Sequence, residues 1–224
     1  MIIRLPSVLT PDELRQIRTQ LETAAWVDGK ATAGHEAVLA KRNQQLAEDG
    51  AECKALGEIV HRAMLRNPLL TTVALPLRIS APMFNRYGVG MGYGDHIDNA
   101  LRGGRAVLRG DLSLTLFLND PSDYDGGELV IEDSGGARSA KLAAGDAILY
   151  PAGTVHRVQP VTRGMRLASF MWIQSVVRDH GDRSLLFDLD RTLGSMRSKG
   201  HSGTPEMVML TGLYHNLLRR WADT

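Results

Sequence analysis

The feature that most constrains this fold is a change in hydrophobic period between residues 78 and 174. Apolar side chains there recur at every second position, in short segments separated by Gly, Pro and Asp, as they do along β-strands. In the segment DLSLTLFLN, residues 111–119, the four leucines share one face. The opposite face carries Asp111, Ser113, Thr115, Phe117 and Asn119. Many short strands predict a β-sandwich or barrel, and the polar face predicts that one side lines a cavity.

Helical patterns precede this region. Thr10 lies three residues before Glu13, with proline at the first helical position, which is the sequence signature of a capped helix start. We therefore expect a helix over residues 11–25. A second helix is expected over residues 44–66, where Asn67-Pro68 ends the pattern.

Helical spacing returns after residue 178. The segment SLLFDLDRTLGSM has leucines at helical intervals, and Thr204-Pro205 begins another apolar stripe. These helices are expected to pack against the β region or against another subunit, so a homo-oligomer formed through them is one prediction. The expected division is residues 1–77 as an N-terminal helical support, 78–174 as a β domain, and 175–224 as a C-terminal helical appendage.

Composition narrows the classes of partner. The chain has 224 residues, with 26 basic and 25 acidic side chains and a net charge of +1, which gives no global attraction for nucleic acid or an anionic membrane. The single cysteine cannot form an internal disulfide, and the first residues lack the apolar core of a signal peptide. The sequence also has no apolar run long enough to span a membrane. We expect a cytoplasmic protein.

The segment YGDHIDN places His96 and Asp98 two positions apart, where a strand would present both to one side. A motif this short arises by chance and needs partners. The best third ligand is His156, in YPAGTVHRV, at the start of a late strand. Two imidazoles and one carboxylate on one face of an octahedron are the preferred environment of non-haem Fe(II) in oxygenases.

Arg166 lies ten residues after His156, beyond a turn. If the two strands form a hairpin, this guanidinium shares the interior with His156, where it is costly to bury without an anion. A bound dicarboxylate would supply that anion through two parallel hydrogen bonds. The structural alternative is an ion pair with a buried carboxylate such as Asp111 or Glu128.

Taken together, these segments resemble the Fe(II)/2-oxoglutarate-dependent dioxygenases, and specifically the PKHD-type hydroxylases related to prolyl 4-hydroxylases. The matching segments are KRNQQL, FNRYGVGMGYGDHID, RGDLSLTLFLN, DGGELVIED and GDAILYPAGTVHRVQPVTRGMR. The resemblance implies a double-stranded β-helix, or jelly-roll barrel, over residues 78–174, mainly β with flanking helices. It also implies Fe(II), 2-oxoglutarate and O₂ as cofactor and co-substrates, with L-ascorbate as accessory reductant.

Residue by residue, the resemblance makes His96, Asp98 and His156 the iron ligands and Arg166 the anchor of the distal carboxylate of 2-oxoglutarate. Tyr87 matches a tyrosine that hydrogen-bonds the same co-substrate, and Tyr93 is a second pocket residue. The implied reaction converts 2-oxoglutarate and O₂ to succinate and CO₂ while a substrate C–H bond is hydroxylated. Asn43 matches a position near the mouth of the site, although composition alone predicts a surface residue.

Other functions use the same ligands. A Zn²⁺ hydrolase holds its metal this way but needs no dicarboxylate anchor, so Arg166 discriminates against it. A non-catalytic jelly roll that senses iron or binds sugar is another alternative. The resemblance also suggests a link to iron uptake, because members of this family are associated with iron-uptake loci.

The substrate is the least constrained element. The segment NALRGGRAVLRGD follows the predicted ligands and carries Arg102, Arg105 and Arg109 within eight residues. Positive charge beside an active site concentrates anions, so we expect an anionic small molecule or peptide, held under a closing loop. An ordinary solvated loop is the alternative.

Overall fold

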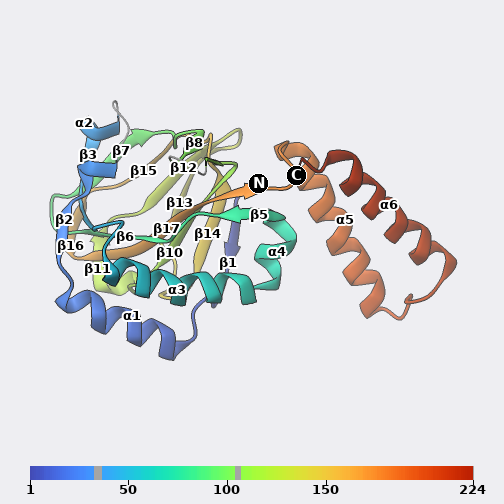
Figure 1. The fold of residues 1–224 in the computed structure, drawn as a ribbon, viewed down its shortest axis with the longest axis horizontal. Coiled ribbons are helices and arrows are strands. Elements are labelled where there is room, and N and C mark those ends of the chain that lie inside the picture. Colours follow the sequence, from blue (N-terminus) through green and yellow to red (C-terminus); the bar gives the residue numbers. More distant parts are fainter. Residues whose placement is uncertain (33–36, 104–106, 224) are drawn as a thin grey trace.

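Two antiparallel sheets form the body of the protein in this computed structural model, which describes residues 1–32, 37–103 and 107–223 (Figure 1). Within those ranges, the larger sheet has the order β1-β14-β10-β17-β6-β4-β2, with β5 also paired to β17. Its strands are β1 (Ile3–Leu5), β2 (Trp26–Asp28), β4 (Gln44–Leu46), β5 (Pro76–Ile79), β6 (Met83–Tyr87), β10 (Leu112–Phe117), β14 (Ala147–Pro151) and β17 (Arg166–Ser175). The expectation of a mainly β fold with flanking helices is confirmed.

The smaller sheet has the order β13-β12-β15-β7-β3. Its strands are β3 (Lys41–Arg42), β7 (Gly92–His96), β12 (Leu129–Asp133), β13 (Gly136–Ala140) and β15 (His156–Val158). Two further pairs lie beside the sheets: β8 (Leu101–Arg102) with β9 (Leu108–Arg109), and β11 (Tyr124–Gly126) with β16 (Val161–Gly164). Gly126, the last residue of β11, has a positive φ of +69° where the pairing with β16 shifts register. A Cβ at this position would lie 2.1 Å from the Pro160 carbonyl oxygen.

Three helices support the larger sheet: α1 (Pro11–Thr23), α3 (Ala51–Arg66) and α4 (Pro68–Ala74). Their buried side chains join those of β10, β14 and β17 in one hydrophobic cluster. The predicted start of α1 is confirmed, because the Thr10 hydroxyl accepts from the Glu13 amide and the Glu13 carboxylate accepts from the Thr10 amide. Shorter elements are α2 (Ala37–Ala40) and two 3₁₀ turns, η1 (Gly29–Thr32) and η2 (Pro121–Asp123).

The expected helix over residues 44–66 is wrong at its start. Gln44–Leu46 form β4, which pairs with β2 and β6 at the edge of the larger sheet, and α3 begins only at Ala51. Leu46 is buried in the main core, so sheet pairing overrides the weak helical pattern of this segment. Residues 1–77 therefore contribute strands to both sheets as well as helices.

The chain ends in a helical hairpin made of α5 (His180–Ser198) and α6 (Pro205–Trp221). Figure 1 shows it projecting from the side of the sheets, with α5 nearer to α4. The Thr204 hydroxyl caps α6, as the Thr204-Pro205 pair predicts. Across the described ranges, no helix has the length and apolarity needed to cross a bilayer.

Candidate active site

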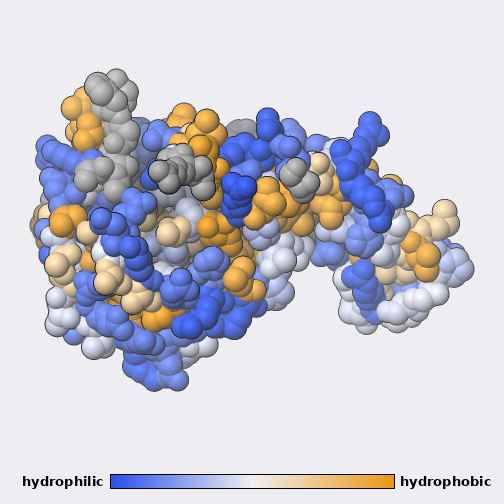
Figure 2. All heavy atoms as spheres, in the orientation of Figure 1, coloured by the Kyte–Doolittle hydropathy of each residue, from blue (hydrophilic) through white to orange (hydrophobic). Residues whose placement is uncertain are grey.

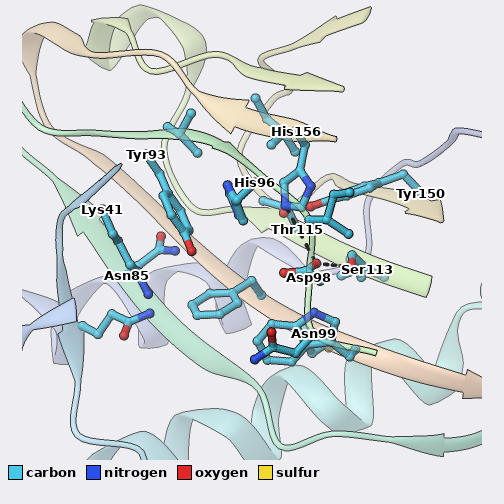
Figure 3. Close-up of a pocket in the computed structure, with 18 of the residues that line it drawn as sticks. Lys41, Asn85, Tyr93, His96, Asp98, Asn99, Ser113, Thr115, Tyr150 and His156 are labelled. Carbon is cyan, nitrogen blue, oxygen red and sulfur yellow. Dashed lines mark hydrogen bonds and ion pairs between the residues drawn. The ribbon is translucent and has the colours of Figure 1, made fainter. Parts of the chain in front are cut away.

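Neighbouring strands of the smaller sheet bring the predicted triad together. His96 ends β7, His156 begins β15, and the two residues are direct partners in the ladder. Asp98 lies just beyond the end of β7 rather than on the strand. One ligand atom from each residue lies within 4.8 Å of the others, and His156 Nε2 is 3.8 Å from Asp98 Oδ2. Figure 3 shows the three side chains converging in one pocket.

Hydrogen bonds orient each of these side chains. His96 Nδ1 lies 2.8 Å from the Gly94 carbonyl oxygen, and His156 Nδ1 lies 2.9 Å from that of Thr154. Because a carbonyl can only accept, both Nδ1 atoms carry the proton in the neutral rings, and each Nε2 keeps its lone pair for a metal. The pKa of His96 is lowered to about 4 by burial and by the neighbouring His156, so its imidazole is neutral at pH 7.

Ser113 is a pocket residue that motif reasoning missed. Its hydroxyl donates to Asp98 Oδ2 at 2.5 Å, from β10 in the larger sheet. Ser113 lies on the polar face of residues 111–119 and lines the pocket. The alternation of polar and apolar residues in this strand was the sequence signal that could have identified it. A hydrogen bond of this kind holds the carboxylate of a metal ligand in one orientation.

Arg166 begins β17, opposite Tyr87 on β6, and only 1% of it is exposed. Its Nε and Nη2 are buried without a hydrogen-bond partner among the described residues. Its guanidinium carbon lies 5.3 Å from the centre of the Tyr87 ring and 5.4 Å from that of Phe117, so two aromatic rings flank the charge. This arrangement leaves donors aimed at a site that an anion fits.

The acids considered as partners of Arg166 are engaged elsewhere. Asp111 binds the guanidinium of Arg109 at 2.7 Å and also accepts from the Ser175 amide. Glu128 lies 3.8 Å from the ammonium of Lys141. The expectation of an ion pair with either acid is therefore not met.

The two predicted tyrosines both line the pocket. The Tyr93 ring stacks on the His96 ring with centroids 3.6 Å apart. Tyr87 is fully buried, and burial raises the pKa of its hydroxyl, which therefore stays protonated as a hydrogen-bond donor. Asn43 is 4% exposed and its side chain neighbours Tyr87, so the prediction of a surface residue from composition is wrong.

The arginine-rich segment divides among different environments. Arg102 lines the pocket with its guanidinium carbon 3.5 Å from the centre of the Trp172 ring. Arg109 does not line the pocket; it pairs with Asp111 and with Asp223 near the end of the chain. Arg105 lies outside the described residues. Of the two described arginines, Arg102 therefore lines the pocket and Arg109 does not.

Lys41 lines the pocket together with the cations Arg102 and Arg166, and sequence reasoning did not single it out. It is 4% exposed, and its ammonium lies 5.3 Å from the centre of the Tyr93 ring. Burial, and then the charge of Arg102, lower its pKa to about 8, so it stays mostly protonated at pH 7. Lys41 and Arg102 therefore add two cationic side chains to the pocket that contains Arg166 and the triad.

Comparison with known proteins gives two family matches. Residues 82–174 match the 2OG-Fe(II) oxygenase superfamily, and residues 173–223 match the PKHD-type hydroxylase C-terminal domain. A PKHD-type hydroxylase of Caulobacter sp. is 54% identical over 228 residues, covering 100% of both chains.

Two solved structures share the fold. A Pseudomonas putida prolyl-4-hydroxylase aligns with a TM-score of 0.53 and 19% identity, covering 78% of this chain and 92% of that one. A Trichoplax adhaerens prolyl hydroxylase, solved in complex with a hypoxia inducible factor peptide fragment, aligns with a TM-score of 0.56 and 17% identity, covering 82% and 86%. The chain is 54% identical to a PKHD-type hydroxylase over its full length, and the oxygenase match includes the triad. It therefore belongs to the PKHD-type hydroxylases and is an Fe(II)/2-oxoglutarate-dependent dioxygenase.

Proposed function

We propose that His96, Asp98 and His156 hold the Fe(II) of this dioxygenase and that Arg166 binds the distal carboxylate of 2-oxoglutarate. The observation that carries this proposal is a buried guanidinium with unpaired donors, in the same pocket as two imidazoles and a carboxylate. The donor set fits Fe(II), and the unpaired N–H groups fit a carboxylate. Neither a Zn²⁺ hydrolase nor a non-catalytic jelly roll accounts for such an arginine.

The remaining pocket residues have positioning roles in this proposal. Tyr87 donates its hydroxyl to 2-oxoglutarate beside Arg166, and Tyr93 covers the His96 ring and limits access of water to it. The bound metal supplies the redox chemistry by which O₂ converts 2-oxoglutarate to succinate and CO₂ and hydroxylates a C–H bond. Ser113 and the carbonyls of Gly94 and Thr154 hold the ligands in place.

The proposed architecture is a double-stranded β-helix formed by residues 78–174, with residues 1–77 as support and 175–224 as a helical appendage. The positions of the two family matches support this division, although residues 1–77 also add strands to both sheets. We further propose a cytoplasmic location, L-ascorbate as accessory reductant and a link to iron uptake; these three proposals rest on the sequence and its family resemblance.

An anionic substrate is the proposal that the pocket favours. Lys41 and Arg102 bring two positive charges into a lining that also contains Asp98. These charges would attract a carboxylate on an iron-chelating molecule or an acidic peptide. The expected homo-oligomer stays a prediction. The exposed surface of α6 suggests which residues would form its interface.

The test of the iron and 2-oxoglutarate assignment is anaerobic titration of apoprotein with Fe(II) and then 2-oxoglutarate. We expect a visible metal-to-ligand charge-transfer band in the wild type and its loss in Asp98→Ala, which removes a ligand but leaves the core intact. Circular dichroism checks that the variant is folded. A folded Asp98→Ala protein with the wild-type band and turnover would contradict the ligand assignment.

The test of the substrate class is a screen of amino acids, peptides and iron-chelating acids for stimulated decarboxylation of 2-oxoglutarate. For an acid that stimulates, Arg102→Gln should raise the concentration needed for half-stimulation at least about tenfold, and more at low salt than at high salt. Arg138→Gln, which removes an exposed arginine paired with Asp133, is the matched control. Stimulation by neutral molecules alone, insensitive to salt, argues against an anionic substrate.

A further inference from the structure

Helix α6 keeps an apolar surface in contact with solvent. Of its 17 residues, only Met207 is buried, where the helix packs on α5. Met209 is 76% exposed and Leu213 is 48% exposed, and hydrophobic spheres are visible along the projecting hairpin in Figure 2. A helix of this length gains most of its stability from burying one face, and α6 buries little of it within its own chain.

The exposed side chains form one stripe with charged ends. Glu206, Met209, Leu213, Leu217 and Arg220 follow each other at intervals of three or four residues, which keeps them on one side of the helix. Leu217 is half-buried, and the two charged residues are exposed. The stripe is about 21 Å long at 1.5 Å per residue, with a negative end, an apolar middle and a positive end. We define these five residues as the α6 stripe.

The α6 stripe is complementary to itself in one orientation. Leu213 lies seven residues from both Glu206 and Arg220, and four residues from both Met209 and Leu217. In an antiparallel pair centred on Leu213, each Glu206 faces an Arg220, each Met209 faces a Leu217, and the two Leu213 side chains meet at the axis. A parallel pair would instead bring like charges together at both ends.

We propose that two copies of this chain associate through an antiparallel α6–α6 contact with two-fold symmetry about Leu213. Two-fold interfaces use the same patch on both subunits, so they require this kind of self-complementary charge pattern. A different protein partner would require no symmetry in the stripe. The contact forms on the hairpin that projects from the sheets, so the second copy approaches on a side away from β7 and β15 (Figure 1).

Equilibrium sedimentation of the full-length protein tests this contact. We expect wild-type protein to dimerise at micromolar concentration and Leu213→Glu to be monomeric there. Glu206→Arg and Arg220→Glu each place two pairs of like charges in the symmetric interface and should raise the dimer Kd at least about tenfold. The double variant Glu206→Arg/Arg220→Glu recreates both opposite-charge pairs and should return the Kd to within about threefold of the wild type.

Arg219→Glu is the matched control, because it reverses the charge of an exposed neighbour that lies off the stripe; its Kd should equal that of the wild type. Far-ultraviolet circular dichroism shows whether each variant keeps its helices. The proposal is overturned if the wild type stays monomeric at about 100 µM, or if a folded double variant fails to recover dimerisation. A dimer that no stripe variant weakens would place the interface elsewhere and would also overturn it.

Discussion

The sharpest prediction concerns Arg166→Met, which removes the charge but keeps most of the aliphatic volume. Removing one partner of a buried ion pair typically costs about 3–5 kcal/mol, because the other charge is left unpaired. Arg166 has no acidic partner among the described residues, and two of its nitrogens are buried without hydrogen bonds. The substitution therefore relieves a desolvation penalty. It forfeits the contacts with the flanking rings of Tyr87 and Phe117, worth up to about 2 kcal/mol, and the interaction with the neighbouring Tyr124 hydroxyl.

We therefore expect the free energy of unfolding of metal-free, co-substrate-free Arg166→Met to lie within about 1 kcal/mol of the wild type, or above it. A domain of this size would show a melting temperature within roughly 4 °C of the wild type or higher. Binding of 2-oxoglutarate should change far more. Two charge-assisted hydrogen bonds are worth about 3 kcal/mol together, which corresponds to a rise in Kd of about 100-fold.

The assays are urea unfolding of the apoprotein and calorimetric titration of 2-oxoglutarate into the Mn(II)-loaded protein. Metal affinity should be unchanged, because Arg166 is not among the three ligand residues. Arg163 lies three residues before Arg166 and forms an exposed ion pair with Asp125. Arg163→Met is therefore the control for removing a nearby charge. An apoprotein destabilised by more than about 3 kcal/mol would reveal a structural ion pair. An unchanged Kd for 2-oxoglutarate would assign its carboxylate to another residue.

Two further predictions concern metal affinity and pH. Ser113→Ala should weaken Mn(II) binding by about 10- to 100-fold in calorimetric titrations, because Asp98 loses its orienting hydrogen bond. Ser169→Ala removes a buried hydroxyl that has no hydrogen-bond partner among the described residues, so it should leave Mn(II) binding unchanged. Equal effects of the two substitutions would refute the orienting role. Hydrogen bonds from Arg66 hold the pKa of Glu13 down at about 2, so its carboxylate stabilises the fold above about pH 4.5 and loses this contribution as the pH falls toward 2. Glu13→Gln should therefore lower the free energy of unfolding by about 1 kcal/mol at pH 7, with the deficit narrowing between pH 5 and pH 3, while Glu22→Gln on the same helix shows no such trend. A deficit that does not depend on pH would mean that the ionised carboxylate is not the stabilising form.

The sequence by itself determined the features that depend on neighbours a few residues apart. The capped starts of α1 and α6 were predictable, because a Thr hydroxyl reaches an amide three residues later. The alternating face of residues 111–119 predicted both a strand and a polar cavity wall, since side chains alternate along any strand. Resemblance to the family then selected His96, Asp98 and His156 from the other candidates.

Only the tertiary structure decided which distant groups meet. The pairing of β4 with β6 made a strand of residues whose local pattern favoured a helix. The packing of the larger sheet over the smaller one set the Ser113 hydroxyl against Asp98. The fold also brought Arg109 to Asp223, and it left Arg166 without an acid among the described residues. Such outcomes depend on contacts between residues far apart in the chain. The free energy of burying a charge also depends on all the groups that surround it in the fold, and a local sequence pattern does not encode them.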